Sequence, residues 1–154
     1  MNLSERIYNL GIHLGLPLGI AAGYRALLNR QADQQLSRRF LINPPASHMP
    51  RAKLWLHGAS VGEMKLVRIL RDWARESLDL EQILVTAGTL SGLRTLDHPR
   101  TELLPMDYPA LLRPFINRLD QAPLVIVETE IWPNLYRLAP GPLYLYNGHL
   151  KPDS

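Results

Sequence analysis

The stretch Leu54-Trp55-Leu56-His57-Gly58-Ala59-Ser60-Val61-Gly62-Glu63 decides the fold of this chain. Its first half predicts a short buried strand, because apolar and aromatic side chains follow two basic residues, Arg51 and Lys53. Gly58 and Gly62 predict a tight turn whose backbone amides face outward. After Gly62 the apolar residues recur at helical spacing. The side chains available for the buried face of this helix are Leu66, Ile69, Leu70 and Trp73.

Glu63 falls in the first turn of that predicted helix. The positive end of the helix dipole favours a carboxylate there, which suits a side chain kept ready to accept a proton. A structural role is equally open, because a Glu at this position also caps helices. The stretch alone does not choose between a proton acceptor and a cap.

The composition is that of one globular domain. The chain has 154 residues, of which 46% are apolar and 20% charged. It contains no cysteine, which excludes disulfides, thiolate metal sites and cysteine nucleophiles and fits a reducing compartment. The net charge is +3 and the pI near 9.4, with much of the basic excess between Arg25 and Lys53. Aromatic residues (7%) do not interleave with a basic stripe, so we expect no nucleic-acid binding.

The N-terminal segment is strongly apolar. Residues 7–24 contain no Asp, Glu, Lys or Arg, and as a helix they would be about 27 Å long, just short of a membrane span. Basic residues follow this run rather than precede it, which argues against a signal peptide. A buried core helix is the alternative to a membrane anchor, either inserted or lying in the interface. We expect an anchor over residues 1–28, a basic, proline-containing linker over 29–50 and one domain over 51–154.

Strands and helices alternate through the domain. After the first strand, strand-like apolar runs are expected at 83–86, 102–105, 124–127 and 143–146, with helices between them. Such alternation predicts an α/β fold with a parallel sheet, right-handed crossovers and helices on both faces. Ligands bind at the carboxyl ends of the strands in such sheets. Polar motifs follow all five strands, at 57–63, 86–89, 107, 128–134 and 147–149.

Three carboxylates are candidates for acid/base chemistry: Glu63, Glu128 and Glu130. In extended backbone Glu128 and Glu130 would point to the same side, roughly 7 Å apart, and could divide acid and base roles or bind substrate hydroxyls. Glu130 could instead be a helix N-terminal carboxylate. Glu128 ends a buried strand, where a carboxylate needs a partner.

Other chemistries have little support. The turn over residues 58–62 could offer amides to an anion, but it is neither a G-x-G-x-x-G nor a P-loop. Ser60 does not lie in a G-x-S-x-G elbow, which argues against a serine hydrolase. The five histidines show no metal-ligand spacing, so we expect no metal.

Four blocks in order resemble one family. They are His57-Gly58-Ala59-Ser60-Val61-Gly62-Glu63, Thr86-Ala87-Gly88-Thr89-Leu90-Ser91-Gly92, Leu104-Pro105-Met106-Asp107 and Glu128-Thr129-Glu130-Ile131-Trp132-Pro133-Asn134. Together they resemble 3-deoxy-D-manno-octulosonic acid (Kdo) transferase, a lipopolysaccharide glycosyltransferase of Gram-negative bacteria. The resemblance implies a GT-B architecture of two Rossmann-like domains, of which this chain is similar to the first, acceptor-side domain, preceded by the apolar anchor helix.

The resemblance also implies an activity and site residues. The family would transfer Kdo from CMP-Kdo to a lipid A precursor, with inversion and with neither a metal nor a cofactor, at the cytoplasmic face of the inner membrane. Glu63 is then the general base. The implied substrate-binding residues are Ser60, Gly62, Thr89, Asp107, Glu128, Glu130, Asn134 and Asn147.

Two departures from the family pattern leave alternatives open. Residues 147–151 read Asn-Gly-His-Leu-Lys where the family has Asn-Ala-Arg-Leu-Ser, which removes a cation from an anion-binding or interdomain contact. The donor domain, which holds most of the CMP-Kdo site, is absent, so we expect this chain to be inactive alone. The main alternative is a membrane-bound, non-catalytic domain that binds the lipid A precursor or has a regulatory role. A nucleotide-binding Rossmann module is a weaker alternative.

Overall fold

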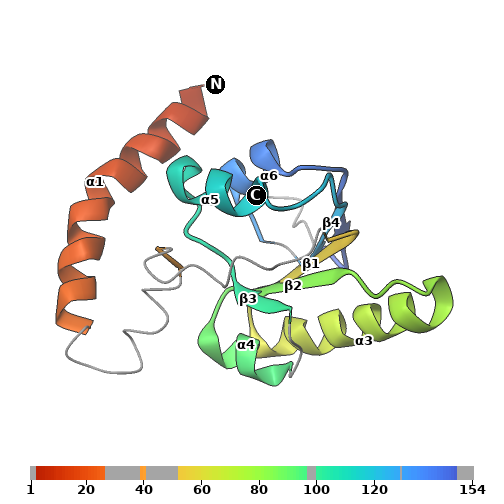
Figure 1. The fold of residues 1–154 in the computed structure, drawn as a ribbon. Coiled ribbons are helices and arrows are strands. Elements are labelled where there is room, and N and C mark those ends of the chain that lie inside the picture. Colours follow the sequence, from red (N-terminus) through yellow and green to blue (C-terminus); the bar gives the residue numbers. More distant parts are fainter. Residues whose placement is uncertain (1–2, 27–38, 41–51, 97–99, 129, 149–154) are drawn as a thin grey trace.

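The computed structural model describes residues 3–26, 39–40, 52–96, 100–128 and 130–148 (Figure 1). The strands are β1 (Leu54–Gly58), β2 (Ile83–Ala87), β3 (Thr101–Leu103), β4 (Leu124–Val127) and β5 (Leu143–Tyr146). The helices are α1 (Leu3–Ala26), α3 (Val61–Leu78), α4 (Leu90–Thr95), α5 (Pro109–Ile116) and α6 (Pro133–Leu138). Each strand of the domain lies where the sequence predicts one, to within a residue or two.

The five strands form one sheet in the order β3-β2-β1-β4-β5, and every neighbouring pair is parallel. β1 lies at the centre, where Leu56 pairs with Val85 on one side and with Val125 on the other. This is the strand order of a doubly wound, Rossmann-like sheet as far as five strands go. The predicted α/β fold with a parallel sheet is therefore confirmed.

Helices cover both faces of the sheet, as predicted. In Figure 1, α3 and α4 lie below the strands, and α5 and α6 lie above them. The lower core joins Leu56, Met64 and Val85, whereas the upper core joins Trp55 and Phe115. Adjacent residues of β1 thus point into opposite cores, which explains why the strand is apolar on both sides.

The prediction for the buried face of α3 is right for Leu66 and Leu70, which are half-buried against the lower core, and wrong for Ile69 and Trp73. Met64, Val67 and Ala74 are buried, whereas the side chains of Ile69 and Trp73 are 62% and 55% exposed. The close approach of α3 to β1 sets this phase, because a β-carbon on Gly58 would lie only 3.0 Å from Val67 Cγ2. Residues 69 and 73 therefore lie on the opposite side of the helix.

Helix α1 contacts the domain through polar side chains on one of its sides. Tyr8 Oη donates to Asp107 Oδ2 over 2.8 Å, and Asn9 Oδ1 accepts from Asn134 Nδ2 over 3.0 Å. The ring of His13 packs edge-on against Tyr108, with 5.1 Å between the ring centroids.

The predicted membrane anchor is not confirmed. Within the described parts of the chain, α1 included, no helix combines the length and the apolar character needed to cross a membrane. The predicted linker over residues 29–50 lies outside the described residues apart from Arg39 and Phe40. Arg39 is joined to the domain, because its carbonyl accepts a hydrogen bond from Met106 N over 3.0 Å.

The glycines of the β1–α3 and β2–α4 turns permit close packing. Gly58 and Gly62 were expected to form the tight turn through glycine's backbone freedom, but no described glycine has a positive φ. A β-carbon on Gly88 would lie 2.9 Å from Ala59 Cα, so the two turns pack backbone against backbone. Gly62 has more room, because a β-carbon added there would lie 3.7 Å from Ser60 Oγ, an ordinary van der Waals distance.

We therefore predict that Gly88→Ala destabilises the domain and that Gly62→Ala does not. The methyl group at position 88 would have to displace backbone atoms of the neighbouring turn, which costs about 1–3 kcal/mol. At position 62, inside the first turn of α3, alanine should leave stability unchanged or raise it by up to about 1 kcal/mol. Urea unfolding of both variants measures the difference. Equal unfolding free energies would show that the turns are not in tight contact.

Candidate active site

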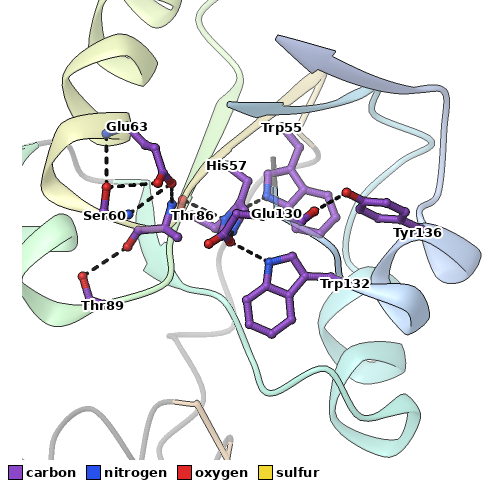
Figure 2. A network of polar contacts seen from close by, with 10 residues as sticks. Trp55, His57, Ser60, Glu63, Thr86, Thr89, Glu130, Trp132 and Tyr136 are labelled. Atoms are coloured by element: carbon purple, nitrogen blue, oxygen red, sulfur yellow. Dashed lines mark hydrogen bonds and ion pairs between the residues drawn. The ribbon is translucent and has the colours of Figure 1, made fainter. Parts of the chain in front are cut away.

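The polar residues that follow the strands meet at one edge of the sheet. β1 pairs with β2 on one side and with β4 on the other. The strand order therefore reverses here: β2 and β3 extend the sheet to one side of β1, and β4 and β5 extend it to the other. In sheets of this kind, such a switch in strand order is where ligands bind. Figure 2 shows the side chains gathered there, including two carboxylates, Glu63 at the start of α3 and Glu130 beyond the end of β4.

The Glu63 carboxylate caps its own helix. Ser60 is the N-cap residue, and its hydroxyl accepts from Glu63 N over 3.4 Å. In return, Glu63 Oε2 accepts from the backbone amides of Ala59 and Ser60, and Glu63 Oε1 accepts from Ser60 Oγ over 3.0 Å. This reciprocal arrangement is a capping box. The structural role considered for Glu63 is thus confirmed, and its role as a base stays a prediction.

A second turn packs beside the first. Thr89 is the N-cap of α4, and its hydroxyl accepts from Gly92 N over 3.1 Å and donates to Ala59 O over 3.2 Å. Thr89 therefore connects the turns that follow β1 and β2. Ser60 and Gly62 are exposed at the same edge, where a ligand could reach them.

Glu130 is held by two ring nitrogens. Trp132 Nε1 donates to Glu130 Oε2 over 2.7 Å, and His57 Nε2 lies 3.4 Å from the same oxygen. Tyr136 Oη donates to the backbone carbonyl of Glu130, which fixes the main chain as well. The Glu130 side chain is 23% exposed, whereas that of His57 is fully buried. One edge of the carboxylate is thus fixed from inside the protein.

The surroundings of Glu130 favour its ionised form. Burial alone would raise the pKa of this carboxyl, but the hydrogen bonds from His57 and Trp132 and the positive charge of Arg39 hold it below its usual value. The guanidinium of Arg39 lies over the Trp132 ring, 5.8 Å from the centroid. Burial lowers the pKa of Arg39, and the negative charge of Glu130 opposes that effect.

Asp107 and Asn134 are buried and engaged within the protein. Asp107, only 3% exposed, accepts from Asn134 N over 3.1 Å and from Leu135 N over 2.8 Å, which caps the N-terminus of α6. Its carboxylate also accepts from Tyr8, and burial together with this hydrogen bond raises the pKa of the Tyr8 hydroxyl. Asn134 Nδ2 donates to Asp107 O over 2.8 Å. These contacts give both residues a structural role, and the prediction that they bind substrate stays open.

The expected pairing of Glu128 with Glu130 rested on extended backbone, and this premise is wrong. Glu128 has φ of 65°, in the left-handed region, so the strand ends at Val127 and the chain turns. Its amide still donates to Tyr146 O over 2.8 Å. Asn147 follows β5 in the same backbone region, with φ of 57°, and is exposed.

Sequence reasoning missed several residues of this site. His57 was placed in the polar motif that follows the first strand, but it was assigned no role of its own beyond being excluded as a metal ligand. Trp132 and Tyr136 follow Glu130 closely in the sequence and carry the polar groups that hold it, but the sequence analysis assigned them no role. Arg39 fell in the predicted linker. Among the described residues no group of three or more His, Asp or Glu side chains could hold a metal. That the reaction needs no metal stays a prediction.

Comparison with known proteins identifies the family. Residues 34–154 match the family model described as 3-deoxy-D-manno-octulosonic-acid transferase (kdotransferase). The chain is 32% identical over 107 residues to the 3-deoxy-D-manno-octulosonic acid transferase of Haemophilus influenzae, covering 66% of this chain and 25% of that protein. It is 28% identical over 141 residues to the Chlamydia muridarum transferase of the same name, covering 85% of this chain and 33% of that protein.

A plant relative is also similar. The "probable 3-deoxy-D-manno-octulosonic acid transferase, mitochondrial" of Arabidopsis thaliana is 29% identical over 121 residues, which cover 73% of this chain and 27% of that protein. The chain thus spans between a quarter and a third of the length of these relatives. Since the family model covers most of the described domain, including both capped turns and the Glu130 loop, the chain belongs to the Kdo transferase family.

Proposed function

We propose that this chain supplies the acceptor-side domain of a Kdo transferase of GT-B architecture. The complete enzyme would transfer Kdo from CMP-Kdo to a lipid A precursor in lipopolysaccharide synthesis, with inversion at the anomeric carbon and without a metal or cofactor. The observation that carries the proposal is the capped Glu63 carboxylate at the carboxyl edge of a Rossmann-like sheet, in a chain of this family. The half of the enzyme that binds CMP-Kdo would lie in further polypeptide, so this chain alone would be inactive.

In this proposal Glu63 is the general base. It takes the proton from the acceptor hydroxyl as that oxygen bonds to the anomeric carbon of Kdo, and the electron pair of the breaking glycosyl–phosphate bond leaves with CMP. The hydrogen bonds from Ala59 N, Ser60 N and Ser60 Oγ fix the carboxylate before substrate arrives. A base fixed in this way needs little reorganisation in the transition state.

The acceptor sugar would bind along the same edge. Ser60, Gly62 and Thr89 belong to the two packed turns, and Asn147 is exposed after β5. Glu130 is an ionised carboxylate whose donors within the described chain converge on Oε2, so that Oε1 can accept from a sugar hydroxyl. Glu128, half-buried after β4, would line the path beyond it.

The edge strand β5 supports the presence of a second domain. Tyr144, Leu145 and Tyr146 are 56%, 46% and 47% exposed, an unusual density of large apolar side chains on one strand. We propose that these residues pack against the donor domain.

We also propose that α1 binds the cytoplasmic face of the inner membrane by lying in the interface. Leu3, Ile7, Leu10 and Leu14 are 58–72% exposed and share one side of the helix, opposite the residues that contact the domain. The acyl chains of a lipid A precursor stay in the bilayer, so an enzyme held at its surface would meet the sugar.

The alternative is a non-catalytic domain of the same family that binds the lipid A precursor or has a regulatory role. The replacement of the family's arginine by His149 motivates it, because neutral histidine would no longer hold an anion. Direct binding of the lipid A precursor, without transfer in the presence of any donor domain, would favour this alternative.

We predict that Glu63→Gln in the enzyme that includes the donor domain lowers kcat for Kdo transfer by about 10²–10⁴-fold. Glutamine at this position preserves the capping box, so stability and lipid binding should stay close to those of the parent enzyme. Glu76→Gln, the same change at an exposed position of α3, is the matched control. Retained transfer in Glu63→Gln would leave Glu63 with its capping role alone.

A second prediction concerns the membrane. Ile7→Glu should lower co-sedimentation of the chain with anionic phospholipid vesicles by about tenfold or more. The reason is that an isoleucine side chain that would be buried in the lipid is replaced by a charge. Ile69→Glu is a closely matched control, since Ile7 and Ile69 are 61% and 62% exposed. Equal vesicle binding by both variants would rule out α1 as the lipid-binding surface.

A further inference from the structure

Four side chains form a continuous series of hydrogen bonds beneath the candidate site (Figure 2). Trp55 Nε1 donates to Thr86 Oγ1 over 2.8 Å, and Thr86 Oγ1 lies 2.9 Å from His57 Nδ1. His57 Nε2 in turn lies 3.4 Å from Glu130 Oε2. Trp55, His57 and Thr86 are completely buried, and only Glu130 reaches solvent. The series runs from the core of the sheet to the edge where substrate would bind.

The donors and acceptors of this series determine where the protons lie. The indole N–H of Trp55 can only donate, so Thr86 Oγ1 accepts there and its own proton must go to another acceptor. His57 Nδ1, at 2.9 Å, is that acceptor. The imidazole proton then lies on Nε2, from which it donates to the Glu130 carboxylate.

Two other protonation states are less favourable. A neutral ring with its proton on Nδ1 could donate to Thr86 O, 3.1 Å away, but the Nε2 lone pair would then face a carboxylate oxygen. In the Nε2–H tautomer the Nδ1 lone pair faces only the neutral carbonyl of Thr86, which repels it less than a charged carboxylate would repel Nε2. A doubly protonated ring would have no lone pair on Nδ1 and would leave the Thr86 hydroxyl proton without this acceptor.

We propose that the Thr86 hydroxyl, oriented by Trp55, fixes His57 as the Nε2–H tautomer and that His57 thereby positions Glu130. The buried His57 ring donates to Oε2 from inside the protein, and Trp132 Nε1 donates to the same oxygen from the loop that also carries Glu130. Together they hold Oε2 and leave Oε1 to accept from another group. That Oε1 meets a sugar hydroxyl rests on the proposed function, whereas the tautomer and its cause do not.

Substitutions at Thr86 separate the hydroxyl from the shape of the side chain. Thr86→Val keeps the volume but removes the hydroxyl, which leaves the backbone carbonyl at position 86 as the partner of Nδ1 among the residues that the structure describes. The proton should therefore move to Nδ1, and the hydrogen bond to Glu130 should be lost. Thr86→Ser keeps the hydroxyl and should retain the parent tautomer.

The measurement is long-range proton–nitrogen correlation NMR on the ¹⁵N-labelled 154-residue chain, with the His57 signals assigned by their loss in His57→Gln. We expect an unprotonated Nδ1 in the parent and in Thr86→Ser, and a protonated Nδ1 in Thr86→Val. A parent ring protonated on Nδ1, on both nitrogens, or unchanged in Thr86→Val would overturn the proposal. Should Thr86→Val not fold, Trp55→Phe removes the indole donor and should likewise lower the Nε2–H population, and an unchanged tautomer there would also overturn it.

Transfer kinetics of the enzyme that includes the donor domain then test the consequence for Glu130. Thr86→Val should raise the KM for the acceptor about tenfold, since a hydrogen bond to a charged group is lost, while Thr86→Ser stays near the parent value. If the enzyme shows no Kdo transfer at all, the proposed function fails but the NMR result stands. A shifted tautomer without any change in KM would show that His57 does not position Glu130 for substrate.

Discussion

The parallel pairing of β1 with both β2 and β4 is the constraint on which the rest of the site depends. Because β1 and β4 are adjacent and parallel, the turn after β1 and the loop after β4 lie at the same edge of the sheet. His57 pairs with Thr86 on one side and with Ile126 on the other, so its ring lies between the two neighbouring strands and contacts Thr86 and Glu130. Glu130, far away in the sequence, meets His57 only because of this strand order.

The sequence predicts the sheet well and the contacts of the site poorly. Runs of apolar residues separated by helical segments are enough to predict parallel strands, because strands covered on both faces must be apolar throughout. The phase of α3 was not predictable in the same way. Ile69 and Trp73 are as apolar as Met64 and Val67, and only the approach of the helix to Gly58 decides which pair is buried.

Buried carboxylates show the same limit. A sequence places Asp107 at the end of a strand, where substrate binding is a reasonable expectation, but it does not show that the amides of Asn134 and Leu135 will be its partners. α6 begins with Pro133 and has no side-chain cap of its own, so the carboxylate of another loop satisfies its first amides. Such a cap, which comes from a distant part of the chain, leaves no local pattern.

The capping of Glu63 and its proposed role as a base are compatible. In the capping box Glu63 Oε2 accepts from the amides of Ala59 and Ser60, whereas Oε1 accepts from Ser60 Oγ. Because a carboxylate oxygen can accept two hydrogen bonds, an acceptor hydroxyl can still donate to Oε1. Glu130 is held differently, by ring nitrogens beneath it and with part of its surface buried. Two carboxylates at one edge, one fixed by backbone amides and the other by ring N–H groups, are in distinct environments, and distinct environments are what allow paired carboxylates to take different roles. In the proposed enzyme Glu63 would accept the proton, while Glu130 would stay ionised and hold the sugar that supplies it.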